Sequence, residues 1–160
     1  MDFDEFAETG LRPLLRFTRV LTGDRGLAED IVQEVLVRLH ARGDRLGDIE
    51  HLGVYARRMA VNEYLGWQRK WLRQRPTSVP PEPPRPNHAD RHAERDWLRS
   101  ELARLPQRQR AVLVLRYYAG LTDAEIADEM GCSPGTVRSH ASRAFATLRV
   151  EITHLKELPT

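Results

Sequence analysis

Residues 121–138, LTDAEIADEMGCSPGTVR, have the spacing of two short helices joined by a tight turn. Thr122 and Glu125 fit a capping box, in which each side chain satisfies a free backbone N–H of the first helical turn. Ala127 is small at a point where two helices must approach closely, and Gly131 lies where a tight turn requires a positive φ angle. This order of residues predicts a helix-turn-helix.

The second helix of this motif is predicted to contact DNA. Ser133 suits its N-cap and Pro134 its first position, so we expect the helix to span residues 133–149. Its apolar side chains form one stripe that we expect to face inward, namely Val137, Ala141, Ala144, Phe145 and Leu148. The outward positions are polar or cationic, namely Thr136, Arg138, Ser139, His140, Ser142 and Arg143.

The absence of a carboxylate from these outward positions indicates a nucleic-acid partner. Such a face suits the major groove of duplex DNA, where Arg reads guanine and where Ser and Thr reach bases or phosphates. A helical hairpin that packs only against protein is the alternative. We favour DNA because an outer face without any acid is unusual on a purely structural helix.

The rest of the chain has helical periodicity, without the alternating pattern of a β-strand. In the C-terminal part we expect four helices, over residues 94–104, 107–119, 123–130 and 134–152. In the N-terminal part we expect two helices within residues 2–20, divided near Gly10–Pro13, and two more over residues 27–41 and 52–71. Residues 43–51 are polar and contain glycine, which predicts a loop.

A proline-rich segment separates the two helical parts. Residues 76–86 contain six prolines in eleven residues, which excludes a helix or an interior strand. The fold class is therefore predicted to be all-α, with two small helical domains joined by a Pro-rich flexible linker. We expect a first domain over residues 1–73, a linker over 74–93, a second domain over 94–152 and a tail over 153–160.

The net charge of +2 hides an uneven distribution of charge along the chain. Residues 1–50 carry eleven acidic and seven basic side chains, whereas residues 51–75 carry one acidic and six basic side chains. Residues 133–150 carry three arginines and no acid. Two separate basic segments indicate two contacts with a polyanion, although solvated helix faces would give the same pattern.

Composition and motifs disfavour several classes of protein. No apolar run approaches the roughly 18 residues that cross a membrane, and the acidic N-terminus lacks the basic and apolar parts of a signal peptide. The single Cys132 excludes an internal disulfide. No catalytic constellation or phosphate-binding loop stands out. We therefore expect a cytoplasmic protein that is not an enzyme and that needs no cofactor or metal.

Two helices of the N-terminal part carry patterns that suggest binding. Asp30, Gln33, Glu34 and Val37 share one face of the helix over residues 27–41, because they follow the spacing i, i+3, i+4 and i+7. A solvated acidic face would explain this pattern equally well. The helix over residues 52–71 interleaves cationic and aromatic side chains, namely Arg57, Arg58, Arg69, Lys70, Tyr55, Tyr64 and Trp67.

Such interleaving suits a melted DNA strand, because cations hold phosphates and aromatic rings stack on unpaired bases. Aromatic residues on a helix are nevertheless more often part of the core. We assign Tyr55 and Tyr64 to the core for this reason.

With these motifs in this order, the chain resembles an extracytoplasmic-function (ECF) sigma factor, group 4 of the sigma-70 family of RNA polymerase sigma factors. The resemblance rests on the motif DIVQEV at residues 30–35, on residues 55–62 and on the helix-turn-helix. It covers residues 3–71 as region 2 and residues 94–150 as region 4. It implies a protein that binds core RNA polymerase and directs promoter recognition and melting.

The resemblance also implies a role for each group of residues. The face that docks on the clamp helices of the polymerase β′ subunit would consist of Asp30, Gln33, Glu34 and Val37. The minus-10 element would contact Asp48, Ile49, Glu50, His51, Arg58, Asn62, Arg69 and Lys70. Within that group, Asn62 would line the pocket for a flipped base. The minus-35 element would contact Thr136, Arg138, Ser139, His140, Ser142 and Arg143.

Further partners follow from the same resemblance. The polymerase β flap would be a second contact of the core enzyme. The family is commonly held inactive by an anti-sigma factor, which makes such a protein a candidate partner. We expect the free protein to be a monomer and to associate with the nucleoid.

The chain departs from the family's pattern at four positions. Tyr55 stands where Trp is frequent. Gly66 stands where Asp is common, and we expect the helix to kink or end there because glycine disfavours a helix interior. His140 occupies a position that is often basic, and Phe145, which we expect to pack inward, occupies one that often holds Arg. The minus-35 sequence should therefore be specific to this protein.

Two other functions remain open. A helix-turn-helix transcriptional regulator with an N-terminal sensor or dimerisation domain would share the C-terminal motif. It would have no reason to present the face formed by Asp30, Gln33 and Glu34. A sigma-like decoy that binds only protein would not need a basic, acid-free recognition face.

Overall fold

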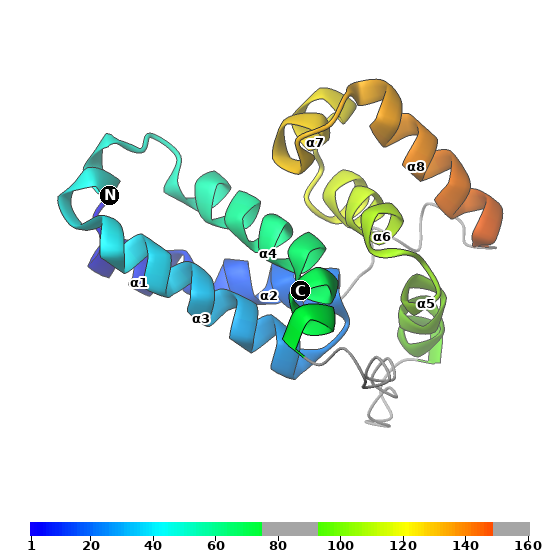
Figure 1. Cartoon of the computed structure of the whole chain (residues 1–160), viewed down its shortest axis with the longest axis horizontal. Helices are drawn as coiled ribbons and strands as arrows, with labels where there is room; N and C mark the ends of the chain where they lie inside the picture. The colour runs from blue at the N-terminus through cyan, green and yellow to red at the C-terminus, as the bar shows by residue number, and fades with distance from the viewer. Residues whose placement is uncertain (75–92, 149–160) are drawn as a thin grey trace. The chain divides into compact units, whose positions relative to one another are not determined.

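Every regular element in the described part of the chain is helical (Figure 1). The computed structural model describes the backbone of residues 1–74 and 93–148, and the side chains of residues 1–67 and 98–148. No strand occurs within these ranges, which confirms the all-α prediction. The proline-rich segment and the predicted tail fall within residues 75–92 and 149–160, outside the described residues.

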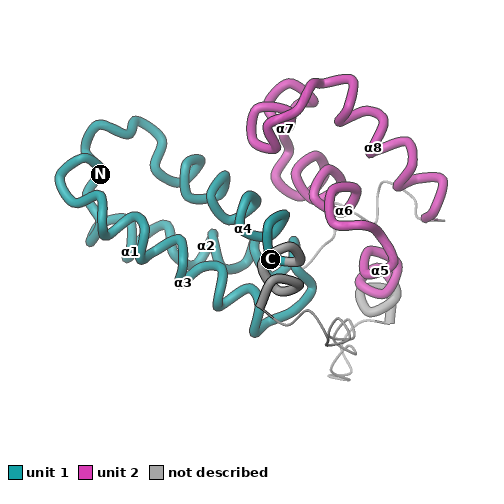
Figure 2. The backbone as a smooth tube through the Cα atoms, viewed as in Figure 1, with its two compact units in different colours: residues 1–67 teal, residues 68–160 magenta. Residues whose placement is uncertain are grey.

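The chain divides into two compact units, Met1–Trp67 and Gln68–Thr160 (Figure 2). The first unit contains α1 (Phe3–Thr9), α2 (Leu11–Thr22), α3 (Arg25–Arg42), the 3-10 helix η1 (Gly43–Asp48) and most of α4 (Leu52–Gln74). The second contains α5 (Ala93–Ala103), α6 (Gln107–Leu113), the π-helix η2 (Val114–Tyr118), α7 (Asp123–Met130) and α8 (Pro134–Thr147).

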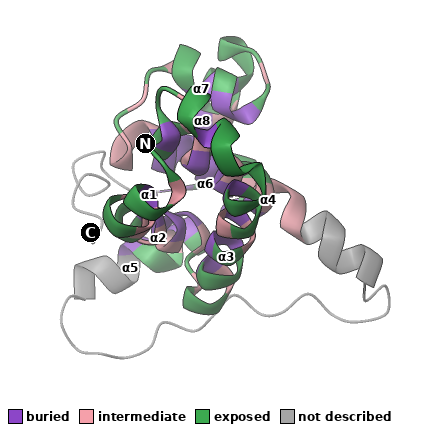
Figure 3. Cartoon of the chain, turned by 90° about the vertical axis from the view of Figure 1, so that its left-hand side faces the viewer, coloured by how far each residue is buried: buried purple, intermediate pink, exposed green. Residues whose placement is uncertain are grey.

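The core of the first unit forms where α2 packs along α3. Figure 3 colours the buried residues of the helices purple. The buried apolar residues of this unit include Phe6, Leu14, Phe17, Leu21, Ile31, Val35, Leu39, Ala60 and Val61. Each large side chain of this kind stabilises the fold by about 1.5–3 kcal/mol. A side chain at Gly10 would overlap the Phe6 ring, so the join between α1 and α2 requires glycine.

The reversal between α2 and α3 is set by two adjacent residues. Gly23 ends α2 in the left-handed region at φ 68°, a conformation that L side chains rarely adopt. Asp24 then caps α3, because its Oδ1 accepts hydrogen bonds from the backbone N–H of Gly26 at 2.9 Å and of Leu27 at 3.3 Å. These two residues place α3 against α2.

The structure differs from the sequence analysis at two places in the first unit. Residues 43–48 form a 3-10 helix where a loop was expected, because Leu46 is buried to 1% exposure and holds this polar segment against the core. The helix α4 continues through Gly66 to Gln74 without ending. Glycine costs about 1 kcal/mol in a helix, and the good helix formers on both sides outweigh this penalty.

The helix-turn-helix of the second unit has the predicted caps. The Thr122 backbone N–H donates to Glu125 Oε1, and the Glu125 backbone N–H donates to Thr122 Oγ1, both at 3.2 Å. Gly131 adopts φ 67°, and Ser133 caps α8 through a bond of 3.1 Å from the Thr136 N–H to its Oγ. The ends of both helices of the motif are therefore set by local hydrogen bonds.

Two helix ends in the second unit differ from the predictions. The expected helix over residues 107–119 is α-helical only to Leu113 and then widens into η2, where the Ala119 N–H donates to the Val114 carbonyl at 3.1 Å. The helix α8 ends at Thr147, before both predicted ends at residues 149 and 152, because Leu148 turns to an extended conformation. Arg149 lies outside the described residues.

The helix α8 packs against both α6 and α7. An ion pair of 2.5 Å between Arg116 Nη2 and Asp123 Oδ1 joins η2 to the first turn of α7. No helix within the described residues is long and apolar enough to cross a membrane. Within those same residues, no group of three or more His, Cys, Asp and Glu side chains is placed to hold a metal ion.

Candidate nucleic-acid interface

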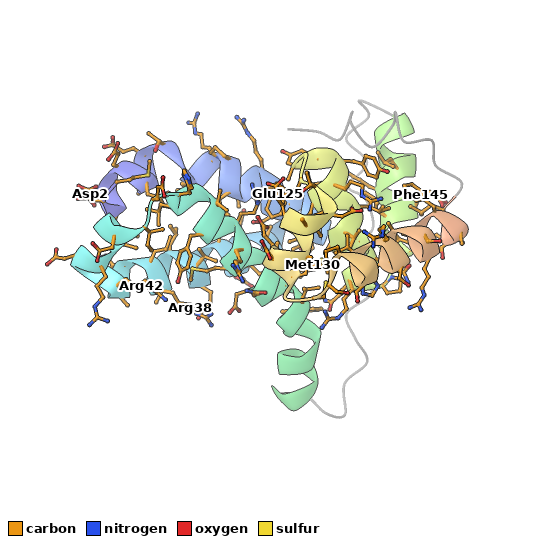
Figure 4. All side chains as sticks on the ribbon, turned by 90° about the horizontal axis from the view of Figure 1, so that it is seen from above. Asp2, Arg38, Arg42, Glu125, Met130 and Phe145 are labelled. Carbon is orange, nitrogen blue, oxygen red and sulfur yellow. The ribbon has the colours of Figure 1, made fainter. Side chains whose placement is uncertain are left out.

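The helix α8 presents the predicted polar face to solvent. Five of its predicted DNA contacts are exposed, namely Thr136, Arg138, Ser139, Ser142 and Arg143, and His140 is half-buried. Four residues of the predicted apolar stripe are buried, namely Val137, Ala141, Ala144 and Leu148. Phe145 (Figure 4) is half-buried and meets the Tyr117 ring edge-on, with ring centroids 6.0 Å apart.

The exposed cations of α8 are available for a partner. Neither Arg138 nor Arg143 forms an ion pair with any described side chain. The Thr136 hydroxyl shares a hydrogen bond of 2.9 Å with Ser133 Oγ at the helix N-terminus. An unpaired guanidinium on a convex helix face is suited to phosphates or to guanine edges.

His140 differs from its neighbours on this face. Its Nδ1 is buried and has no hydrogen-bond partner among the described residues. Burial lowers the pKa of His140 below its ordinary value, and the positive charges of Arg108 and Arg143 lower it further. The imidazole is therefore neutral near pH 7, unlike a lysine or an arginine at the same position.

The second predicted face, on α3, is exposed at three of its four positions. Asp30 and Gln33 are exposed, and the side chain of Val37 is an exposed large apolar group at 64%. Glu34 is half-buried, and its Oε1 accepts a hydrogen bond of 2.9 Å from Arg38 Nε. The face therefore combines one free acid, an amide, an apolar group and an acid that is already paired.

Arg38 (Figure 4) links this face to α4. Its Nη2 lies 2.7 Å from Oε1 of Glu63, whose side chain is only 12% exposed. The pair of Arg38 with Glu34 could have been predicted from the sequence, because it has the i, i+4 spacing of helix pairs. The pair with Glu63 could not, because that residue comes from another helix.

The predicted minus-10 residues lie in two groups. On α4, Arg58 and Asn62 are exposed one turn apart. Between α3 and α4, Asp48, Glu50 and His51 are exposed and Ile49 is half-buried, with His51 Nε2 3.8 Å from Glu50 Oε1. Arg69 and Lys70 belong to α4, but their side chains lie outside the described residues.

The aromatic residues of α4 divide between core and surface. Tyr64 is 5% exposed, which confirms its predicted place in the core. Tyr55 is only half-buried, and the guanidinium carbon of Arg42 (Figure 4) lies 5.1 Å from the centroid of its ring. This cation–π contact occupies one face of Tyr55, and sequence reasoning missed it.

Comparisons with known proteins identify the family of this chain. The family model for sigma-70 region 2 matches residues 6–75, and the family model for sigma-70 region 4 matches residues 95–148. The chain is 35% identical over 153 residues to the RNA polymerase sigma-E factor of Streptomyces coelicolor. The aligned region covers 95% of this chain and 86% of that relative.

One further relative and one solved structure match nearly the whole chain. The ECF RNA polymerase sigma factor SigL of Mycobacterium tuberculosis is 32% identical over 159 residues, covering 96% of this chain and 88% of that relative. The sigma factor RpoE of Bartonella quintana, solved in complex with the anti-sigma factor NepR, has a similar fold. It gives a TM-score of 0.66 at 23% identity, over 99% of this chain and 98% of RpoE. The chain therefore belongs to the sigma-70 family of RNA polymerase sigma factors, as an extracytoplasmic-function sigma factor that acts in transcription initiation.

Proposed function

We propose that this sigma factor contacts the promoter through α8 at the minus-35 element and through α4 at the minus-10 element, while α3 docks on core RNA polymerase. The observation that carries the proposal is the exposed face of α8, which holds Arg138 and Arg143 without a carboxylate or a described ion-pair partner. Region 2 would span residues 1–73 and region 4 residues 94–152, joined by the linker over residues 74–93.

Different residues along α8 would contact different parts of the minus-35 DNA. Arg138 and Arg143 would reach guanine edges or phosphates, and Ser139 and Ser142 would reach bases between them. Thr136 lies at the helix N-terminus, where backbone N–H groups and the helix dipole favour a phosphate. The helix would thus be held by phosphates at its start and would read bases along its outer face.

The minus-10 contact would involve a melted strand. Exposed Asn62 has an amide that can hydrogen-bond the edge of a flipped base, and exposed Arg58 one turn away can hold a phosphate. The segment from Asp48 to His51 would set the specificity of that pocket. Arg69 and Lys70 would extend the basic track along α4.

The polymerase contact would use the α3 face. Exposed Asp30 and Gln33 offer polar contacts, and exposed Val37 offers an apolar one, for the clamp helices of the β′ subunit. Glu34 would contribute as part of its pair with Arg38. The β flap would hold the second unit, and the protein would act at the nucleoid.

Regulation by an anti-sigma factor is consistent with this arrangement. RpoE of Bartonella quintana was solved with the anti-sigma factor NepR. A partner of the same class would inhibit this chain by covering the α3 face or the α8 face. Before such a partner binds, we expect the free chain to be a monomer.

Matched charge variants test the polymerase contact. Asp30→Lys should weaken the affinity of the full chain for core polymerase about tenfold, because it places a cation where the docking face needs an acceptor. Glu8→Lys is the control, since it makes the same charge change at an exposed position of α1. Equal affinity for the two variants would exclude the α3 face as the docking site. A reversal at Glu34 is less informative, because it also breaks the pair with Arg38.

A second pair of variants tests the DNA contact. Arg138→Ala should cost the holoenzyme about 1–3 kcal/mol of binding to a duplex with its minus-35 element. The control Arg12→Ala removes an exposed arginine from α2 and should leave that affinity unchanged. If Arg138 pairs with guanine, the loss appears as a changed base preference at one position. A uniform loss across sequences would make Arg138 a phosphate contact.

A further inference from the structure

One side chain of the α8 face has an asymmetric environment that sets what it can recognise. His140 lies three residues before Arg143 and four after Thr136, so all three share one flank of the helix. Unlike exposed Thr136 and Arg143, the imidazole is half-buried. Its Nδ1 is sealed from solvent and has no described hydrogen-bond partner, although part of the half-buried residue remains accessible to solvent.

This asymmetry selects one tautomer. A proton on Nδ1 would be a buried donor without an acceptor, which is the costlier arrangement. A proton on Nε2 leaves only a lone pair at the sealed position and places the N–H where solvent or a ligand can accept it. The ring therefore offers a single outward hydrogen-bond donor.

The surroundings also oppose a second proton on the ring. That proton would have to occupy the sealed Nδ1. Arg108 on α6 and Arg143 on α8 are the charged groups that shift the ring among the described residues, and both lower its pKa. The helix α7, which also packs on α8, contributes no charged group to that shift. His140 therefore remains neutral at the pH of the cell.

We propose that His140 is a specificity-determining residue of the minus-35 contact, in which the Nε2–H of a neutral imidazole donates one hydrogen bond to an acceptor on a base edge. This inference rests on the proposed function, in which α8 occupies the major groove. The acceptors available there are N7 and O6 of guanine, N7 of adenine and O4 of thymine. A neutral donor can also reach a phosphate, but such a contact would carry no preference for one base pair.

Two amide variants separate the donor position from the volume of the side chain. In His140→Gln, the amide nitrogen lies the same number of bonds from Cβ as Nε2, so it can replace the outward donor. In His140→Asn, the amide nitrogen matches Nδ1 and cannot reach outward. Both variants are neutral and polar.

The test measures binding of the full chain with core polymerase to duplexes that carry each single base-pair change across the minus-35 element. For the natural chain we expect a preference of about 3- to 10-fold at one base pair that depends on His140. His140→Gln should keep this preference, and His140→Asn should abolish it. The slope of log affinity against log salt should be equal for all three proteins.

Several results would overturn the inference. An unchanged preference in His140→Asn would mean that His140 reads no base, and loss of the preference in both variants would mean that ring shape decides. A uniform loss of affinity with a salt slope reduced by about 1 would mean a cationic phosphate contact. If the natural holoenzyme prefers no upstream sequence at all, the proposed minus-35 contact itself fails.

Discussion

The bridge from Arg38 to Glu34 and Glu63 gives a quantitative prediction for the first unit. Replacing Arg38 by Met keeps the aliphatic stem of the side chain and removes the guanidinium. Two interactions are lost, the bond of 2.9 Å from Nε to Glu34 Oε1 and the pair of 2.7 Å from Nη2 to Glu63 Oε1. We expect the two losses to differ in size.

The exposure of the two acids decides the magnitudes. The side chains of Arg38 and Glu34 are 47% and 45% exposed, so this i, i+4 pair should contribute only about 0.3–0.5 kcal/mol. Glu63 is 12% exposed, and an acid that loses its partner at such a site costs about 1–3 kcal/mol. Glu63 has further interactions, so we expect the pair to contribute about 1–2 kcal/mol.

Double-mutant cycles measured by hydrogen exchange of the α3 and α4 amides isolate each term, because the exchange reports the free energy of opening of this unit. The cycle of Arg38→Met with Glu63→Gln should give a larger coupling energy than the cycle of Arg38→Met with Glu34→Gln. The exposed pair between Arg25 and Glu29, at 3.5 Å, is the control and should give at most about 0.5 kcal/mol. A coupling to Glu63 below that of the control would refute the reasoning.

Three further predictions concern glycines and pH. Gly10→Ala should destabilise the first unit by about 1–3 kcal/mol in urea unfolding, because the new methyl group overlaps the Phe6 ring. An unchanged midpoint would contradict the packing. Gly66→Ala should stabilise α4 by about 1 kcal/mol, since the added methyl meets open space in a right-handed helix, whereas Gly131→Ala should cost about 1–2 kcal/mol because φ is 67°. Equal unfolding shifts for these two variants would contradict that contrast. The pKa of His140 is lowered in the folded state, so the unfolded chain takes up this proton first as the pH falls below about 6.5. The stability of the second unit should therefore fall as the pH drops from about 6.5 to the lowered pKa, and this component should be absent from thermal unfolding of His140→Gln.

The sequence predicted the helix-turn-helix well because its determinants are local. The capping box of Thr122 and Glu125, the left-handed Gly131 and the cap at Ser133 each involve residues within a few positions of one another. The polar face of α8 was predicted from the helical spacing of its apolar residues. Short-range hydrogen bonds therefore decide where the two helices begin and end, and the spacing of the apolar residues decides which side of α8 faces outward.

Features that depend on distant residues could not be predicted in the same way. The sequence of η1 predicts a polar loop. The segment instead forms a 3-10 helix, because Leu46 is buried against the core of the first unit. The pair of Arg38 with Glu34 has the local i, i+4 spacing, but the second contact of Arg38, with Glu63, joins two helices and has no signal in the sequence. The sealed Nδ1 of His140 likewise depends on packing between helices.

Promoter-specific initiation is the most direct test of the account. Core polymerase from the organism that encodes this chain is mixed with the full chain and with pooled genomic fragments, and the 5′ ends of the transcripts are sequenced. We predict discrete start sites that appear only when the chain is present, that weaken with Arg138→Ala and that persist with Arg12→Ala. If no discrete start site appears on any fragment while the chain alone binds duplex DNA, the sigma-factor account is contradicted and a helix-turn-helix regulator takes its place.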